Sequence, residues 1–239
     1  MASIKEIQQA LTEQGFDTGG VDGIWGRKSI AAARAFQARK GLTADGVVGP
    51  KTLAALFPAG APVAAGAAAG SDSHPPVWYE EARNLLGLRE GPGKKDNPTI
   101  LDWADDLDIH YKSDDIPWCG LFVAHCIGST LPDEPLPTNP LGAKNWARFG
   151  VSSNVAPGAV LVFWRESPTS GKGHVGFYYG EDDTAYHVLG GNQGDSVSVT
   201  RVAKNRLVQN GVRRPSSFPP LAGGVVRRKP DGSLSSNEA

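Results

Sequence analysis

The chain has 239 residues, room for one large or two small domains, and its hydrophobic and charged fractions of 40% and 21% are ordinary for a globular protein. A net charge of −1 argues against the basic field with which proteins bind nucleic acids or anionic membranes. No apolar run approaches the ~20 residues that insert across a membrane, and the stretch from Met1 to Gln9 lacks the apolar core of a secretory signal.

A repeat organises the N-terminal part of the chain. Asp22–Ser29 recurs as Asp45–Thr52, and each copy is an Asp-Gly turn, a second Gly and the start of a helix. Ser3 and Glu6 form a capping box that starts an earlier helix, and apolar residues at helical spacing accompany each turn. We therefore predict a three-helix module over residues 1–57, which is small for a core that folds alone.

Residues 58–76 are dominated by Ala, Gly and Pro, which interrupt helices, so this segment is predicted to be a flexible linker. Beyond it three helical patterns appear, near residues 78–86, 100–107 and from about 115 onward.

Strand-like runs follow these helices, and Gly180–Asp183, which separates two of the runs, is predicted to form a hairpin turn. The runs cover residues 159–164, 174–179, 185–189 and 197–202. Helices followed by antiparallel strands predict an α+β domain over residues 77–215. The Pro-, Gly- and Ser-rich segment 216–239 is expected to be a loosely held tail.

Cys119 is the first candidate for a catalytic group. It lies in the first turn of the third predicted helix of this domain, where backbone N–H groups and the helix dipole favour a thiolate, the nucleophile of cysteine hydrolases. The alternative is a buried structural cysteine, which is our interpretation of Cys126. Two turns of helix separate the two thiols by about 10.5 Å, so no disulfide is expected between them.

A nucleophile of this kind needs a base, and the chain has five histidines. Three of them are poorly placed for this role. His74 lies in the linker, His110 lies in a polar stretch, and His125 lies on another side of the helix that carries Cys119. His174 opens a strand, where side chains are well placed for a site, so we prefer it to His187, which is mid-strand and for which the alternative is a packed histidine.

The base in turn needs an orienting partner. With the hairpin turn near residues 182–183, residues 190–192 lie opposite His174. Asn192 is therefore predicted to accept the imidazole N–H, as in Cys-His-Asn enzymes. The alternative is that Asn192 serves only the turn after Gly191.

The sequence lacks the spacings typical of metal sites, such as His-Glu-x-x-His, Cys-x-x-Cys or a calcium loop. No metal or organic cofactor is therefore predicted. Trp118, which precedes the candidate nucleophile, is expected either to belong to the core or to line the substrate cleft.

The N-terminal repeat resembles the peptidoglycan-binding module of many cell-wall hydrolases. The matching residues are Val21–Gly26, Ala35–Gln37, Gly41–Leu42 and Asp45–Thr52. The resemblance implies that residues 1–57 bind peptidoglycan without cutting it, with Asp22 and Trp25 as candidate binding residues.

The C-terminal part resembles the CHAP-like and NlpC-like cysteine peptidases, which share a papain-like core. The matching segments are Pro117–Val123, Pro157–Phe163, Gly173–Gly176 and Gly190–Gln193. The resemblance implies that Cys119 is the nucleophile, His174 the base and Asn192 the third residue, with Trp118 beside the substrate.

Two positions depart from the family pattern. Ala159 replaces the usual Asp after Pro-Gly, and Gly190 replaces a Glu that is common in CHAP enzymes two residues before the Asn. The third catalytic role therefore rests on Asn192 or on a group that the sequence does not identify.

These features predict a two-domain peptidoglycan hydrolase that cleaves an amide bond of the stem peptide, or its junction with muramic acid, as an endopeptidase or an N-acetylmuramoyl-L-alanine amidase. The lack of a signal sequence fits a phage endolysin made in the cytoplasm and released through a holin-type pore to act on the wall, in the periplasm or outside the cell. A bacterial toxin delivered by a secretion apparatus would look the same. The alternatives from other classes are a non-catalytic wall-binding protein and a glycan-cleaving muramidase.

Overall fold

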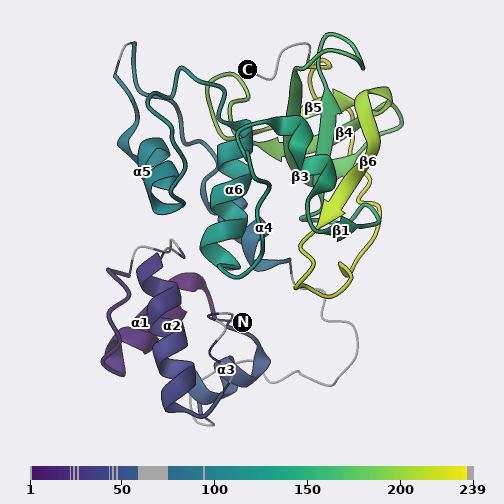
Figure 1. The fold of residues 1–239 in the computed structure, drawn as a ribbon. Helices are drawn as coiled ribbons and strands as arrows, with labels where there is room; N and C mark the ends of the chain where they lie inside the picture. Colours follow the sequence, from purple (N-terminus) through teal and green to yellow (C-terminus); the bar gives the residue numbers. More distant parts are fainter. Residues whose placement is uncertain are drawn as a thin grey trace. The chain divides into compact units, whose positions relative to one another are not determined.

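The structure is a computed structural model that describes residues 2–21, 23, 25, 27–42, 44, 46, 48–58, 75–93 and 95–235. The chain divides into two compact units, a helical N-terminal module and a larger α+β unit (Figure 1). Asp22, His74 and most of the predicted linker lie outside the described residues. Among the residues described, no helix has both the length and the apolar character needed to cross a membrane.

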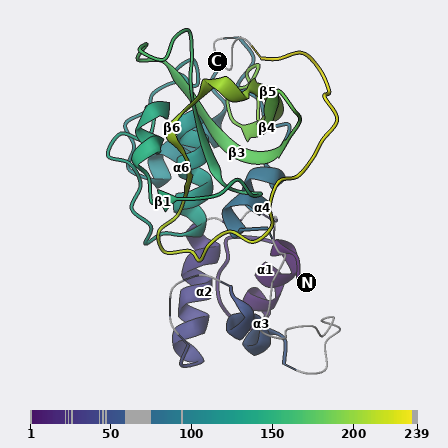
Figure 2. The same cartoon turned by 90° about the vertical axis from the view of Figure 1, so that its right-hand side faces the viewer.

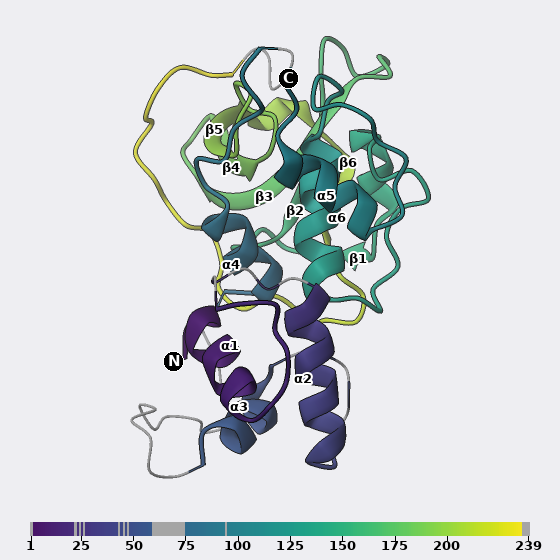
Figure 3. The same ribbon diagram turned by 90° about the vertical axis from the view of Figure 1, so that its left-hand side faces the viewer.

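The N-terminal module contains the three predicted helices, α1 (Ile4–Glu13), α2 (Arg27–Arg39) and α3 (Pro50–Leu56) (Figure 3). The predicted capping box is present at the start of α1, where the Ser3 side chain accepts from the Glu6 N–H and Glu6 accepts from the Ser3 N–H. Leu11, Ala33 and Phe36 are fully buried at the centre of the module. The helical pattern of the sequence is thus confirmed for this part of the chain.

Two buried glutamines explain the repeat in this module. Gln8 accepts from the Gly23 N–H at 2.8 Å and donates to the Ser29 hydroxyl at 3.1 Å. Gln37 does the same in the second copy, accepting from the Gly46 N–H at 2.8 Å and donating to Thr52 at 3.1 Å. Each copy therefore uses one amide side chain to join the turn glycine to the helix that follows it, which satisfies buried polar groups.

The larger unit begins with helices α4 (Val77–Asn84), α5 (Pro98–Asp106) and α6 (Cys119–Thr130). α6 lies between α5 and the sheet (Figures 1 and 3). The ring of Phe122 on α6 is 6.1 Å from that of Trp103 on α5 and 6.0 Å from that of Phe177 in the sheet. Apolar residues surround α6 on both sides, which explains why its sequence is apolar nearly all round.

Six antiparallel strands form one sheet in the order β1-β6-β2-β3-β4-β5. Strands β3 and β4 lie side by side in it (Figure 2). Helices followed by an antiparallel sheet confirm the predicted α+β class. Two strands, β1 and β6, have no counterpart in the sequence prediction, and Ala143–Arg148 forms a 3₁₀ helix, η1. The strands are β1 (Val151–Ser152), β2 (Val160–Trp164), β3 (Gly173–Glu181), β4 (Ala185–Gly190), β5 (Ser198–Ala203) and β6 (Leu207–Arg214), with a second 3₁₀ helix, η2 (Lys204–Arg206), before β6.

The predicted hairpin joins β3 and β4. Phe177 pairs with Leu189, and the register shifts by one residue before Gly180 pairs with His187. The Asp182 carboxylate accepts hydrogen bonds within the turn, including those from the backbone N–H groups of Thr184 and Ala185. This turn chemistry is typical of Asp and fixes where the hairpin reverses.

The segment after β6, for which the sequence predicts a loosely held tail, makes several hydrogen bonds to the sheet. The Glu181 N–H donates to the Val226 carbonyl at 2.8 Å, and the Arg228 N–H donates to the Glu181 carbonyl at 2.9 Å. Further along, the Arg201 guanidinium donates to the Gly232 carbonyl at 2.6 Å.

Candidate functional site

Cys119 is the first residue of α6, as the sequence predicts, and only 4% of it is exposed. The helix start is packed so closely that a Cβ on Gly120 would lie 2.1 Å from the Pro140 carbonyl oxygen. Only glycine fits there, and its backbone brings the segment around Pro140 and Leu141 against the turn that carries the thiol.

The same end of α6 lies against the beginning of β3 and the end of β4. The backbone N–H of Val175 hydrogen-bonds the Cys119 thiol. A Cβ on Gly191 would lie 2.6 Å from both the Trp118 ring and the Phe122 Cβ, so glycine is needed where the chain leaves β4. Because Val175 follows His174 directly, the fold brings the two predicted catalytic residues to one end of the sheet.

His187, the alternative base, is engaged at the other end of the hairpin. Its Nε2 lies 3.0 Å from an Asp182 carboxylate oxygen that also accepts from Arg201 at 2.8 Å. The hydrogen bonds from Arg201 and the turn hold the pKa of Asp182 far below its usual value despite desolvation. His187 therefore belongs to a structural cluster at the turn, which agrees with its interpretation as a packed histidine.

A defined hydrogen bond orients His174. Its Nε2 lies 2.9 Å from the Gln193 Oε1, and the histidine is fully buried. The Gln193 amide nitrogen donates to the carbonyls of Val188 at 3.2 Å and Ser198 at 2.5 Å, so Oε1 is the atom that accepts. His174 Nε2 must then carry the hydrogen, which leaves Nδ1 as the basic nitrogen of the ring.

Asn192 does not occupy the place that the sequence predicts for it. The β3–β4 register, continued past the end of β4, would set residue 192 opposite His174, but β4 ends at Gly190. Asn192 has a φ of 57°, in the left-handed region that Asn tolerates in turns. The chain turns there, and it is the next side chain, Gln193, that reaches the imidazole.

In the sequence, Gly190 is the residue that indicates why Gln193, and not Asn192, contacts His174. A Cβ at this position would lie 3.1 Å from His174 Nε2 and 3.0 Å from Gln193 Oε1. A side chain at position 190 would thus be aimed at the histidine, where the resembling CHAP enzymes commonly have Glu. With glycine instead, that space is left for Gln193.

The pKa of the Cys119 thiol is raised, because burial disfavours the charged form. Hydrogen bonds from the N–H groups of Val175 and Gly120 and the positive charge of Arg165 oppose this effect without reversing it. The backbone N–H groups at the helix start do favour the thiolate, as the sequence predicts, but burial outweighs them. Burial likewise raises the pKa of Cys126 well above its usual value, and neither cysteine forms a disulfide.

The predicted substrate-binding residues are buried or outside the described residues. Trp118 is fully buried and its Nε1 donates to Glu90 at 2.6 Å, which agrees with the core alternative. Trp25 is 6% exposed within the core of the N-terminal module. Substrate could touch either indole only if covering residues moved, and Asp22 is not described. Their binding roles stay predictions.

The histidine of α6, His125, is paired with a carboxylate. His125 lies 3.3 Å from the buried Glu81 carboxylate and stacks on Trp103 with ring centroids 4.6 Å apart. In the part of the chain that the structure describes, no three His, Cys, Asp or Glu side chains are grouped to hold a metal ion.

Comparison with known proteins assigns the first unit. Residues 1–56 match the family described as a peptidoglycan binding domain, which confirms the predicted N-terminal peptidoglycan-binding domain. The N-acetylmuramoyl-L-alanine amidase CwlM of Mycobacterium tuberculosis is 41% identical over 54 residues, and this alignment covers 23% of the present chain and 13% of the amidase. No solved structure matches the chain. The similarity lies in the N-terminal domain, so the role of the α+β unit is inferred from its geometry.

Proposed function

We propose that the protein is a peptidoglycan hydrolase whose α+β unit cleaves an amide bond through Cys119. The observation that carries this proposal is that the thiol of a cysteine at a helix N-terminus accepts from the N–H of Val175, which directly follows a histidine that a third side chain orients. A nucleophile, a base and an orienter of the base form the arrangement that cysteine hydrolases use. The papain-like core implied by the family resemblance is part of the same proposal.

In this mechanism His174 Nδ1 accepts the thiol proton as the Cys119 sulfur attacks the amide carbonyl carbon. The resulting oxyanion is stabilised by backbone N–H groups at the start of α6, among them that of Cys119. His174 then protonates the leaving amine, and water hydrolyses the thioester to release the acid and restore the thiol. Gln193 keeps the proton on Nε2 and so keeps Nδ1 available throughout.

The raised pKa of Cys119 is compatible with this sequence of steps. A neutral thiol in the resting site means that proton transfer to His174 accompanies attack, instead of a stable ion pair preceding it. The positive charge of Arg165 lowers the cost of forming the thiolate.

The N-terminal domain supports a substrate in the bacterial wall. A domain that binds peptidoglycan holds the chain on an insoluble polymer, so the α+β unit acts where amide bonds of stem peptides are abundant. The relative CwlM is named an N-acetylmuramoyl-L-alanine amidase, which suggests the junction of muramic acid and the peptide as one such bond.

The test is digestion of purified sacculi followed by mass spectrometry of the released muropeptides. New amino termini should appear with the native protein and be absent with Cys119→Ala, while Cys126→Ala serves as the matched control and keeps activity. New reducing ends instead would identify a muramidase. No new ends of either kind, with binding to sacculi retained, would identify a non-catalytic wall-binding protein.

A further inference from the structure

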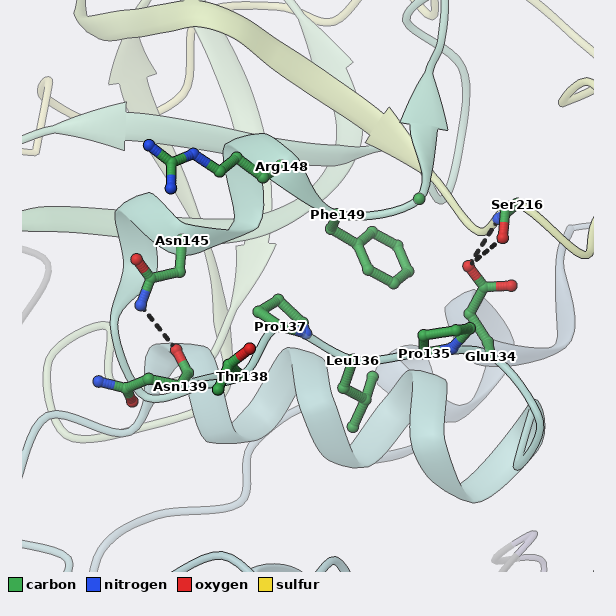
Figure 4. Close-up of a pocket in the computed structure, with 11 residues that line it drawn as sticks. Glu134, Pro135, Leu136, Pro137, Thr138, Asn139, Asn145, Arg148, Phe149 and Ser216 are labelled. Atoms are coloured by element: carbon green, nitrogen blue, oxygen red, sulfur yellow. Dashed lines mark hydrogen bonds between the residues drawn. The ribbon is translucent and has the colours of Figure 1, made fainter.

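A pocket of about 630 Å³ lies in the α+β unit beside the segment that leads from α6 to η1 (Figure 4). Arg148, Asn145 and Asn139 lie at one end, and Glu134 and Ser216 lie at the other. Apolar side chains occupy the part between the two ends, namely Pro135, Leu136, Pro137 and Phe149.

Both walls of the polar end are fastened to residues next to the catalytic pair. On one side, Asn139 is followed by Pro140, whose carbonyl packs against Gly120 beside Cys119. On the other side, η1 carries Asn145 and Arg148, and its first residues pack against Gly173 beside His174. A Cβ on Gly173 would lie 3.0 Å from the Lys144 side chain. The two segments that form the polar end therefore pack against residues next to Cys119 and His174.

The charge at the Glu134 end is already satisfied within the protein. One Glu134 oxygen accepts from the Ser216 N–H at 2.6 Å and the Ser216 hydroxyl at 2.9 Å, and the other accepts from the Ser217 N–H at 2.8 Å. Burial alone would raise the pKa of Glu134, but these hydrogen bonds lower it overall. This carboxylate anchors the segment after β6 and is not available to a ligand.

The charge at the other end is available. Arg148 is exposed, and within the described part of the chain it makes neither an ion pair nor a side-chain hydrogen bond. A guanidinium presents a planar fork of donors that matches a carboxylate. Asn145 already donates to the Asn139 carbonyl at 2.8 Å, which holds its amide at the same end of the pocket as Arg148.

The walls favour a peptide over a sugar. Sugars in protein sites commonly stack on an exposed aromatic face, but Phe149 is 3% exposed and packs on Trp146 with ring centroids 5.0 Å apart. The remaining apolar surface comes from proline and leucine, which suits methyl groups such as those of alanine.

We propose that this pocket is a subsite for the stem peptide of peptidoglycan, which binds with a free carboxylate on Arg148 and small aliphatic side chains against Pro137 and Leu136. This inference rests on the proposed function, because the stem peptide is the substrate of that reaction. It makes Arg148 a specificity-determining residue of the α+β unit, distinct from the wall binding of the N-terminal domain.

The experiment measures hydrolysis by the full chain of two soluble muropeptides that differ only in whether the stem carboxylate is free or amidated. With the free acid, Arg148→Gln should raise KM roughly ten-fold, the loss expected for one charged hydrogen-bonded contact, and leave kcat within about two-fold. With the amidated peptide, native protein and Arg148→Gln should have the same KM. Arg148→Lys should recover part of the loss, and Arg83→Gln, at an exposed position of α4, is the matched control.

An unchanged KM for the free acid in Arg148→Gln, or an equal loss on both peptides, would overturn the subsite. If the native protein cuts neither peptide, the proposed function fails separately, and calorimetric titration of Cys119→Ala with the free-acid peptide then tests the pocket. Binding that disappears in the Cys119→Ala, Arg148→Gln double variant supports the subsite without any turnover. Absence of binding to Cys119→Ala itself rejects it.

Discussion

The Nε2 of His174 lies 2.9 Å from the Oε1 of Gln193, and this contact determines which ring nitrogen is basic. Gln193→Ala should therefore lower kcat by about ten- to a hundred-fold while the protein stays folded, because the imidazole loses its tautomer and orientation. Muropeptide turnover and a circular dichroism melt measure the two quantities. The loss should be smaller than in Cys119→Ala, which removes the bond-forming atom.

Asn192→Gly is the control for this prediction, since glycine accepts the left-handed backbone at that position. It should keep most of the turnover. The opposite pattern, with Asn192→Gly impaired and Gln193→Ala unaffected, would return the orienting role to Asn192.

A second prediction concerns rescue from position 190. A side chain there points at His174 Nε2, so Gly190→Glu placed in the Gln193→Ala background should recover part of the lost kcat by supplying a carboxylate acceptor. In the native background the same substitution should reduce activity, because its Cβ would lie 3.0 Å from the Gln193 oxygen. Steady-state kinetics of the four proteins form a double-mutant cycle. Purely additive losses would show that residues 190 and 193 do not share this role.

The sequence predicts the local parts of this site better than their assembly. Cys119 at the start of a helix and His174 at the start of a strand follow from helix and hairpin patterns that involve neighbouring residues. The contact of Gln193 with His174 depends on where β4 ends and on one left-handed residue, and neither has a periodic signal. The hairpin register alone therefore assigns the orienting role to Asn192, one residue before the Gln193 that contacts His174.

Long-range packing also explains why the sequence does not predict strands β1 and β6 or the raised pKa of the Cys119 thiol. Strand β6 (Leu207–Arg214) has polar residues on both faces, so its sequence lacks the alternation of apolar and polar residues that predicts a strand. Its position beside β2 is set by the pairing of the sheet. The pKa of Cys119 depends on burial, and its thiol bonds to the N–H of Val175, which is distant in sequence. Helix position predicts one contribution to this pKa, and tertiary burial provides the larger one.

The third prediction follows from that raised pKa. Only the thiolate reacts with iodoacetamide, so at pH 7 Cys119 should be alkylated more slowly than a free cysteine, and its rate should keep rising as the pH passes 9. Arg165→Gln should move the profile to still higher pH, because the Arg165 charge lowers the pKa. Mass spectrometry of the modified peptide, with Cys126→Ala to remove the second thiol, gives the rates. A profile that levels off below pH 7 would mean that the thiolate is already formed in the resting site.

The last prediction separates wall binding from catalysis. The N-terminal module has its own buried core and its own network of buried glutamines, so removal of residues 1–70 should leave the α+β unit folded. Soluble muropeptides should be cut by the truncated protein at a near-native rate, because Cys119, His174 and Gln193 all lie after the break.

Activity on intact sacculi should fall, most clearly at low protein concentration, since a short tether raises the local concentration of the second domain to the order of mM. The decrease should vanish at high protein concentration, where free diffusion supplies the same encounter rate, and the isolated module should co-sediment with sacculi. A truncated protein that clears sacculi as well as the full chain at every concentration would show that the peptidoglycan-binding domain does not deliver the α+β unit to its substrate.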